Sequence, residues 1–331
     1  MPIYGVKSKL GLTFQTSFDT MADITNSHIN IPYLSETLTT NLEDILSEQI
    51  EGVFDEKERY RGKQHVSGDI EVEVGAKSIG MLLASMFDKT STVTSDSIYT
   101  HTFLPIQSEE TTNSWHWPLT INKGSNDGNA QNFYNLCATS AEFSLEQGGF
   151  LKAKFSYVGG INNNTTTDPA DNYNSNDELF TWDASTFFLA NPTWSQKLTS
   201  MTINVTEPIE PQFTLANSYW PRSNNLNGFR DVTFNFTMPW NNNSDYTYFF
   251  NTTSSAQISL ECFGHSEIQS GYTNKIVFDM YNCMYESFEA SASGPGEVEL
   301  NISGRAQYNT TQATAIKIEL TNLLDGTIYK T

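Results

Sequence analysis

The sequence predicts a mainly β protein built from two tandem units of the same kind, and three observations support this prediction. Apolar and polar residues alternate along most of the 331 residues, as they do in antiparallel strands with one buried and one solvated face. Residues that favour strands are plentiful, among them 21 Phe and 15 Tyr. Two separate blocks of the first half also recur in the second half with the same alternation.

Runs of alternating residues locate the expected strands. In the first half these are residues 66–74, 99–104, 117–121, 140–146 and 151–157. In the second half they are residues 201–205, 231–238, 256–262, 276–280, 287–292, 297–302 and 315–320. One stretch in each half has a helical pattern instead, residues 76–86 and residues 242–250. Each unit is therefore expected to combine several strands with one short helix.

The first repeated block is a strand in each half. Aligning Asp69 with Asp231 places GDIEVEV (residues 68–74) over RDVTFNF (residues 230–236), with apolar residues at the same alternate positions. A slip of one residue would move every apolar side chain to the opposite face of the sheet. Agreement in alternation over two blocks therefore favours duplication over two unrelated β-domains with coincident patterns.

The second repeated block is an expected hairpin near the end of each half. Residues 140–156 (SAEFSLEQGGFLKAKFS) align with residues 287–303 (SFEASASGPGEVELNIS). A Tyr-Asn pair precedes each copy, in YNLC and in YNC. Gly149 and Gly296 take the same place in the turn, where a positive φ is easily adopted only by glycine.

A polar, turn-rich stretch, residues 159–177, separates the two halves. We expect it to be a linker or a long exposed loop. The chain then divides into a first unit (residues 1–160), a linker (residues 161–180) and a second unit (residues 181–331).

Charge and hydropathy exclude several classes of protein. The 38 acidic residues outnumber the 18 basic ones, for a formal net charge of −20. A surface this acidic repels nucleic acid, so a module that grips DNA through clustered basic residues is not expected. The longest apolar run, residues 79–87, is far shorter than the roughly 20 residues that span a bilayer. The chain start lacks the pattern of a signal peptide, and we expect assembly in a cytoplasm.

No sequence pattern indicates an enzyme, and we expect no cofactor and no metal. The odd number of cysteines, without C-x-x-C spacing, is typical of buried free thiols. The five histidines form no H-E-x-x-H motif, and the chain has no nucleophile elbow or phosphate-binding loop. His116 lies between Trp115 and Trp117 and is expected to be a packed or interface residue.

Several segments resemble those of phage tail tube proteins, in a two-domain, duplicated branch of that family. They are IPYLSETL (residues 31–38), GDIEVEV (68–74), LLASMF (82–87), KLTSMTINV (197–205) and GFRDV (228–232). The resemblance extends over nearly the whole chain. It depends on strand alternation and glycine placement rather than on invariant chemical residues.

The resemblance implies two tandem tail-tube-type domains, each a β-sandwich or half-barrel with one short helix and a long loop. Proteins of this type form stacked rings whose inner strands join into a β-barrel around a channel for DNA ejection. Two domains per chain would give homotrimeric rings with pseudo-sixfold symmetry, and hexamers are the alternative.

The same resemblance implies the partners and the location. The partners would be other copies of the chain, adjacent rings, the tail terminator, baseplate proteins and, in a contractile tail, a sheath. Genomic DNA would pass through without specific binding. The protein would belong to the virion tail and be assembled in the host cytoplasm.

The polar faces of the expected strands are rich in carboxylates. Our hypothesis is that these faces line the lumen and keep DNA phosphates off the wall. The alternative is that they are the ordinary solvated faces of antiparallel strands. The predicted lumen-facing residues are Asp69, Glu71, Glu73, Glu142, Glu146, Asp231, Glu289, Glu297 and Glu299.

Each half also has a long expected loop between its early strands, residues 35–63 and residues 206–229. Within the first, residues 43–61 mix acids, bases and apolar residues, and we expect this segment to pack against a neighbouring subunit or ring. A mobile solvent loop is the alternative. The predicted inter-subunit residues are Ile45, Ile50, Val53, Phe54, Glu56, Arg59 and Arg61.

Two other functions are compatible with a β-rich chain. One is a carbohydrate-binding β-sandwich or fibre protein, because tryptophans can stack on sugars. The six tryptophans, however, are scattered over turns and loops of both halves, which suits packing or interfaces better. The other is a different tail or injection-machine component, such as a tail terminator or a secretion-system tube.

Overall fold

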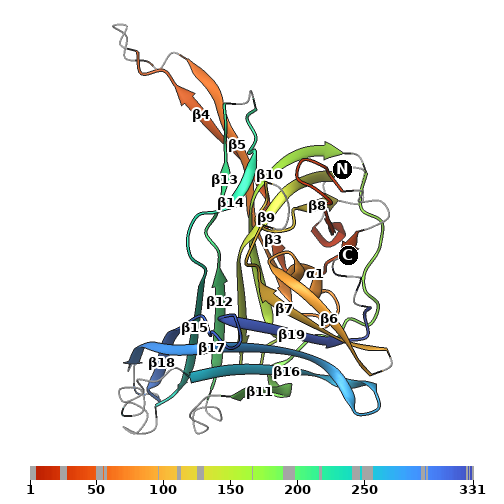
Figure 1. Cartoon of the computed structure of the whole chain (residues 1–331), viewed down its shortest axis with the longest axis vertical. Coiled ribbons are helices and arrows are strands. Elements are labelled where there is room, and N and C mark those ends of the chain that lie inside the picture. The colour runs from red at the N-terminus through yellow and green to blue at the C-terminus, as the bar shows by residue number, and fades with distance from the viewer. Residues whose placement is uncertain are drawn as a thin grey trace.

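The computed structural model of the chain confirms the mainly β fold class (Figure 1). It describes residues 5–22, 28–49, 55, 58–95, 97–109, 113–124, 130–165, 167–188, 198–215, 218–240, 247, 256–291, 295, 297–325, 327 and 329.

Strands alternate with short turns along both halves. In the first half the strands are β1 (Lys9–Phe14), β2 (Ile29–Asn30), β3 (Ser35–Glu36), β4 (Thr39–Leu46), β5 (Arg59–Glu73), β6 (Phe87–Ser95), β7 (Ile98–Pro105), β8 (Leu119–Gly124), β9 (Ala130–Glu146) and β10 (Lys152–Thr165). In the second half they are β11 (Ser185–Phe188), β12 (Ser200–Thr206), β13 (Ile209–Gln212), β14 (Ser223–Leu226), β15 (Asp231–Pro239), β16 (Ala256–Gln269), β17 (Tyr272–Ser291), β18 (Glu299–Ala306) and β19 (Ile316–Asn322). The helical elements that lie wholly within the described residues are α1 (Ile79–Ala84) and two 3₁₀ turns, Gly5–Lys7 and Trp182–Ala184.

One large sheet, which we call the main sheet, runs through both halves of the chain. Its strands follow the order β4–β5–β10–β9–β12–β15–β18–β17, and all neighbours are antiparallel. The short strand β3 lies beside β5, just before β4 in the chain. The halves meet where β9 pairs with β12, from Ser200 opposite Glu146 to Thr206 opposite Ser140. Both expected units therefore contribute to one continuous sheet.

A second layer, the covering sheet, packs on the apolar face of the main sheet. Its order is β11–β16–β17–β19–β7–β6, and it uses the first part of β17, whose last part belongs to the main sheet. Figure 1 shows β16, β17 and β19 crossing the direction of β9 and β12. Aromatic rings join the layers, with 4.7 Å between the centroids of Phe143 and Phe278 and 6.3 Å between those of Phe187 and Phe236.

The start of β9 and the end of β10 extend beyond the covering sheet and belong to a third group of strands. There β9 pairs with β8, β8 with β1, and β1 with the short β2. Leu10, Leu12, Ile121 and Phe133 from these strands are buried and extend the same apolar core. The core is therefore continuous from one end of the body to the other.

The helix α1 is shorter than the predicted span of residues 76–86. All six of its residues are buried, since this run is apolar throughout. The carboxylate of Asp177 accepts hydrogen bonds from the backbone N–H groups of Lys77 (2.6 Å) and Ser78 (3.1 Å), just before the helix starts. Phe87, expected near the helix end, instead begins β6. The second expected helix, residues 242–250, lies outside the described residues except for Thr247.

The expected linker, residues 161–180, is packed against the first half. Its first residues extend β10 to Thr165, because the Asn- and Thr-rich stretch continues the pairing with β9. Farther along, Tyr173 and Leu179 form bridges with Asn30 and Gly75. Phe180 is fully buried. The segment therefore contacts the first half at a few points, while many of its residues stay exposed.

The two long expected loops also contain strands, so their description as loops is corrected. The first, residues 35–63, holds β3, β4 and the start of β5, and the second, residues 206–229, holds β13 and β14. Each forms an antiparallel hairpin. Figure 1 shows the β4–β5 hairpin projecting beyond the body, with β13 and β14 beside its base.

Strand pairing corrects the sequence alignment of the first repeated block. Asp69 pairs with Ser156, whereas the aligned counterpart of Ser156, Ser303, pairs with Asn235. The ladder therefore matches Asp69 with Asn235, four residues from the predicted Asp231. An even shift keeps each side chain on its face, which is why the alternation agreed in spite of the wrong register.

The second repeated block has the same backbone features in both copies. The asparagines of its Tyr-Asn pairs, Asn135 and Asn282, both have positive φ, at 61° and 48°. In the turn of the first copy the positive φ, 83°, belongs to Gly148 and not to the predicted Gly149. Gly296 lies outside the described residues.

Candidate assembly surfaces

One face of the main sheet is polar from β5 to β18, and on β17 the exposed Met284 lies opposite Arg305. A single row of directly opposed residues crosses it from β5 to β18, and none of its members is apolar. The row consists of Glu71, Lys154, Glu142, Asn204, Thr233 and Arg305. The neighbouring rows contain serines, threonines, asparagines and further carboxylates in the same positions. This polar face lies opposite the core and is not covered by the second layer.

The predicted carboxylates gather on this polar face. Those in main-sheet strands, all at least partly exposed, are Asp69, Glu71, Glu73, Glu142, Glu146, Asp231, Glu289 and Glu299. Glu297 is exposed and lies two residues before β18. The sequence alternation thus brought the acidic residues of β5, β9, β15, β17 and β18 to one surface.

Cations are interspersed among these carboxylates. Lys154 Nζ lies 2.9 Å from Asp69, and Arg305 Nε lies 3.3 Å from both Asp231 and Glu286. Burial disfavours the charged form of Asp69, but hydrogen bonds from Lys154 and Ser156 outweigh it and lower the pKa of this carboxyl. Such exposed pairs contribute little to stability. They leave the face acidic, because the carboxylates outnumber Lys152, Lys154 and Arg305.

Both margins of the main sheet are paired on one side only among the residues that the structure describes. At one margin, β3 and β4 pair with β5. At the other, residues 284–291 of β17 pair with β18. A margin of this kind presents backbone N–H and C=O groups that can bind a further strand.

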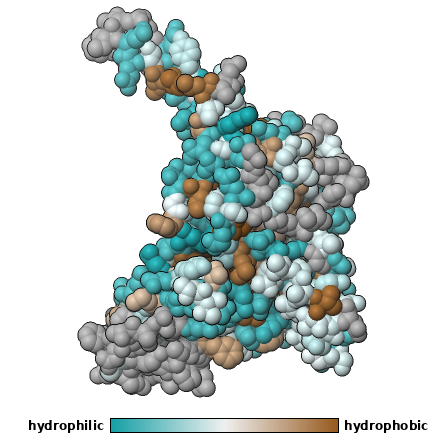
Figure 2. All heavy atoms as spheres, in the orientation of Figure 1, coloured by the Kyte–Doolittle hydropathy of each residue, from teal (hydrophilic) through white to brown (hydrophobic). Residues whose placement is uncertain are grey.

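The projecting β4–β5 hairpin, which we call the arm, carries exposed apolar side chains. Leu42, Ile45 and Tyr60 are each more than half exposed. Figure 2 shows a brown, hydrophobic patch on the arm between hydrophilic atoms. The second hairpin supports its base, since the backbone N–H of Gln64 donates to the carbonyl of Tyr219 at 2.8 Å.

The predicted inter-subunit residues are only partly described. Ile45, Arg59 and Arg61 lie on the arm and are exposed, and Arg59 forms an ion pair with Asp44 at 3.4 Å. The remaining predicted residues, Ile50, Val53, Phe54 and Glu56, lie outside the described residues.

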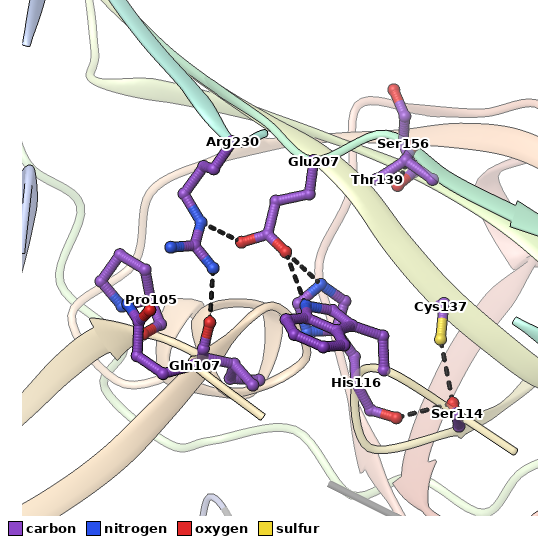
Figure 3. A network of polar contacts seen from close by, with 11 residues as sticks. Pro105, Gln107, Ser114, His116, Cys137, Thr139, Ser156, Glu207 and Arg230 are labelled. Carbon is purple, nitrogen blue, oxygen red and sulfur yellow. Dashed lines mark hydrogen bonds and ion pairs between the residues drawn. The ribbon is translucent and has the colours of Figure 1, made fainter. Parts of the chain in front are cut away.

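A buried charged cluster between the halves was not predicted from the sequence (Figure 3). Its centre is Glu207, a fully buried carboxylate directly after β12. One oxygen of Glu207 pairs with Arg230, and the other accepts a hydrogen bond from Trp115 Nε1 at 3.0 Å and lies 3.3 Å from His116 Nε2. Arg230 also donates to the carbonyl of Ile106 at 2.6 Å.

This cluster ties the segment before β8 to the ends of β12 and β15. Burial opposes ionisation of Glu207, but His116 and Arg230 outweigh it and hold the pKa of Glu207 below its usual value. The Trp-His-Trp sequence was the available signal, since it marked His116 as a packed residue. The partners Glu207 and Arg230 lie about one hundred residues away in the chain, and no local pattern connects them.

The described residues contain no group of three or more His, Cys, Asp or Glu side chains placed to hold a metal ion. Within the same part of the chain, no helix has the length and apolar character needed to cross a membrane. The surfaces that remain are the acidic face, the two open margins and the arm.

Comparison with known proteins gives a family for this arrangement. No curated protein matches the chain. A family model described as "Phage tail tube protein" matches residues 5–315. The match includes the arm and every strand of the main sheet. This chain therefore belongs to the phage tail tube protein family.

Proposed function

We propose that the chain is the major tail tube subunit of a phage, and that its copies close into stacked rings around a channel for DNA ejection. Membership of the family makes it a structural tail protein. The observation that supports the finer proposal is the main sheet, whose two margins remain open while its strands pass through the whole chain. Joining such margins into a closed barrel removes both edges.

The width of the sheet supports a ring of three chains. Each chain supplies eight strands to the main sheet, so three chains would supply roughly 24 strands to a barrel. At about 4.8 Å between strands and a tilt of about 40°, the backbone barrel would be roughly 48 Å across. Inward side chains would leave an opening of about 35–40 Å, which admits a DNA duplex.

In this proposal the acidic polar face lines the lumen. The covering sheet protects the opposite, apolar face, so the polar face is the surface available to an aqueous channel. Its carboxylates would repel DNA phosphates and reduce friction with the wall. The arm would reach a neighbouring subunit or ring, because its exposed apolar residues lie away from the body. The tail terminator, the baseplate and the host cytoplasm as the site of assembly belong to the same proposal.

Electron microscopy of the purified chain tests the proposal. We expect rings or tubes whose cross-section contains three chains and six similar lobes. Six chains per ring would contradict the trimer but remain consistent with a tail tube subunit. Discrete monomers at every concentration, together with binding to glycans, would favour a carbohydrate-binding protein instead.

A further inference from the structure

The junction between the two halves is an ordinary antiparallel seam. Seven residues of β12 pair with seven of β9. The backbone N–H of Glu207 donates to the carbonyl of Thr139 at 2.7 Å, and that of Gln147 donates to Thr199 at 2.9 Å. In this register the pairs that point to the core, such as Ile203 with Phe143, are hydrogen-bonded pairs. The pairs on the polar face, such as Asn204 with Glu142, are the non-hydrogen-bonded ones.

The strand on the β9 side of the seam has a close counterpart in β17. The pairs of the β9–β10 ladder next to the seam recur 147 positions later in the β17–β18 ladder. Lys152 pairs with Ser144, for example, and Glu299 pairs with Ser291. The correspondence holds through the same bulge, which skips Thr139 in β9 and Glu286 in β17. Residues 284–291 of β17 therefore present the same edge as β9, but their outer side has no strand partner among the described residues.

The strand on the β12 side also has a counterpart, at the opposite margin of the sheet. Ser200 pairs with Thr237 of β15. Ser35, which lies 165 positions earlier in the chain, pairs with Glu71 of β5. The same spacing of 165 positions relates Asn204 to Thr39, whose partners are Thr233 and Ser67. Residues 35–41 therefore form an edge equivalent to that of β12.

We infer that the seam inside the chain repeats between chains, so that β17 of one copy pairs in the same register with residues 35–41 of a second copy. Transferring the internal register gives the pairs. They are Leu38 with Ala290, Thr39 with Glu289, and Asn41 with Ser287. This inference rests on the proposed function and adds to it the identity and the register of the joined strands.

Burial at the two kinds of edge supports this partner. At the internal seam the core-facing residues Ala141, Phe143, Ile203 and Val205 are each at most 1% exposed. At the open margin of β17, Ala290, the counterpart of Phe143, is exposed. A second copy seated on this margin would cover that position as β12 covers its equivalent. The polar face would then continue from one chain to the next without interruption.

A pair of cysteines on the polar face tests the register directly. The variant Thr39→Cys/Glu289→Cys places thiols at a non-hydrogen-bonded pair, where Cα atoms about 4.5 Å apart allow a disulfide. An added mild oxidant takes two electrons while the two thiols lose their protons and form the S–S bond. Under non-reducing denaturing electrophoresis we expect a ladder of linked chains that ends at the number of chains in one ring.

Three matched variants complete the experiment. Asn41→Cys/Ser287→Cys is a second in-register pair and should also form the ladder. Thr39→Cys/Ser287→Cys is displaced by two residues, which separates the side chains by about 7–8 Å, and should form it at least tenfold more slowly. Glu142→Cys/Asn204→Cys reproduces the internal seam and should form a disulfide within one chain, without a ladder.

The possible results separate the inference from the proposed function. Two results, each together with tubes in the microscope, would overturn the inferred register and leave the tube proposal in place. One is a ladder from the displaced pair, and the other is the lack of a ladder from both in-register pairs. A wild-type chain that forms neither rings nor tubes would overturn the proposed function and the inference with it. Ladders from both in-register pairs and not from the displaced pair would establish the inferred seam.

Discussion

At the scale of single residues, the feature that most clearly joins the halves is the charge buried at Glu207. A carboxylate without access to water is costly unless its oxygens are paired, and here Arg230, Trp115 and His116 surround it. Removing one member of such a cluster leaves the others buried without their partner. Stability at this position should therefore depend on the charge and not only on the shape of the side chain.

The substitution Glu207→Gln, which keeps the shape and removes the charge, should lower the free energy of unfolding by about 3 kcal/mol. The reason is that the guanidinium of Arg230 would stay largely buried without its carboxylate. Urea denaturation of the unassembled chain measures the change. Glu210→Gln, at an exposed position of strand β13 close by, is the matched control and should change stability by less than about 0.5 kcal/mol. Equal losses for both variants would contradict the prediction.

The same carboxylate should make stability depend on pH. The pKa of Glu207 is lower in the folded chain than in the unfolded one. Its contribution is therefore complete above the unfolded pKa of about 4.3 and is lost as the pH falls through the folded value. The difference in unfolding free energy between wild type and Glu207→Gln should be constant near pH 7 and shrink in acid below about pH 4. A difference that grows on acidification would refute this assignment.

At the scale of elements, the arm is the part of the molecule with the least internal support. It is a two-stranded hairpin, a structure that is only marginally stable by itself, and its apolar side chains face outward. Among the described residues, the β13–β14 hairpin contacts it near its base, through the hydrogen bond from Gln64 to Tyr219 and through Lys63, whose Nζ lies over the ring of Phe213. An exposed apolar patch on such an element is typical of a surface that becomes buried in an assembly.

The substitution Ile45→Asp should therefore weaken assembly without unfolding the chain. We expect the protein concentration needed for tube formation to rise by about tenfold, equivalent to about 1.4 kcal/mol per contact. Sedimentation of tubes over a concentration series measures the effect. Val93→Asp changes an equally exposed apolar residue on the β6–β7 hairpin and should leave the threshold where it is. A shift of the same size in both variants would show that added charge, and not the arm, is responsible.

Sequence alternation predicted the strands in the middle of the sheets but missed those at the margins. Every strand expected between residues 66 and 320 coincides with an observed strand, although residues 276–280 and 287–292 proved to be parts of one long β17. The marginal strands β2, β3, β4, β6 and β11, the separate pair β13 and β14, and the inner strand β1 were not expected. In β3 and β4 all residues are exposed or partly exposed, so no apolar alternation marks them. The start of the expected linker was not expected to be a strand, because its Asn- and Thr-rich residues show no apolar alternation although they pair with β9.

The candidate surfaces were predictable to the extent that they follow from alternation. The carboxylates share one face because a period of two places Glu71 and Glu73 on the same side of β5, whatever the register between strands. The register itself depends on bulges and turns, which is why Asp69 was aligned four residues away from its counterpart. The Glu207 cluster brings together distant segments, and single-strand patterns contain no information about such contacts.

At the scale of the whole molecule, the acidic face and the covering sheet give the chain two unlike surfaces. One is polar and open, and the other is apolar and covered by strands from both halves. In the proposed ring the open surface faces DNA, and its charge acts on phosphates over about 8–10 Å at physiological salt. The effect of this charge should therefore be visible in DNA passage and should fade as salt is added.

Reversing charge on interior strands of the acidic face tests its role. The double variant Glu73→Lys/Glu299→Lys, on β5 and β18 and each one strand in from the proposed inter-chain seam, should still form tubes but slow DNA ejection several-fold at low salt, because the wall would attract phosphates. Ejection from phage that carry the variant is measured by the fluorescence of a DNA-binding dye as the DNA is released. Glu267→Lys, exposed on β16 in the covering sheet, is the control. An unchanged ejection rate with intact tubes would show that the acidic face does not line the channel.

The pairing of β9 with β12 also has a kinetic consequence. In the proposed ring, half of the joints form as each polypeptide folds, and only the remaining half require encounters between molecules. Closing the first ring then needs three bodies instead of six, so its initial rate should rise with about the third power of concentration. In the proposed ring, carrying both units on one polypeptide would thus make nucleation far less sensitive to dilution.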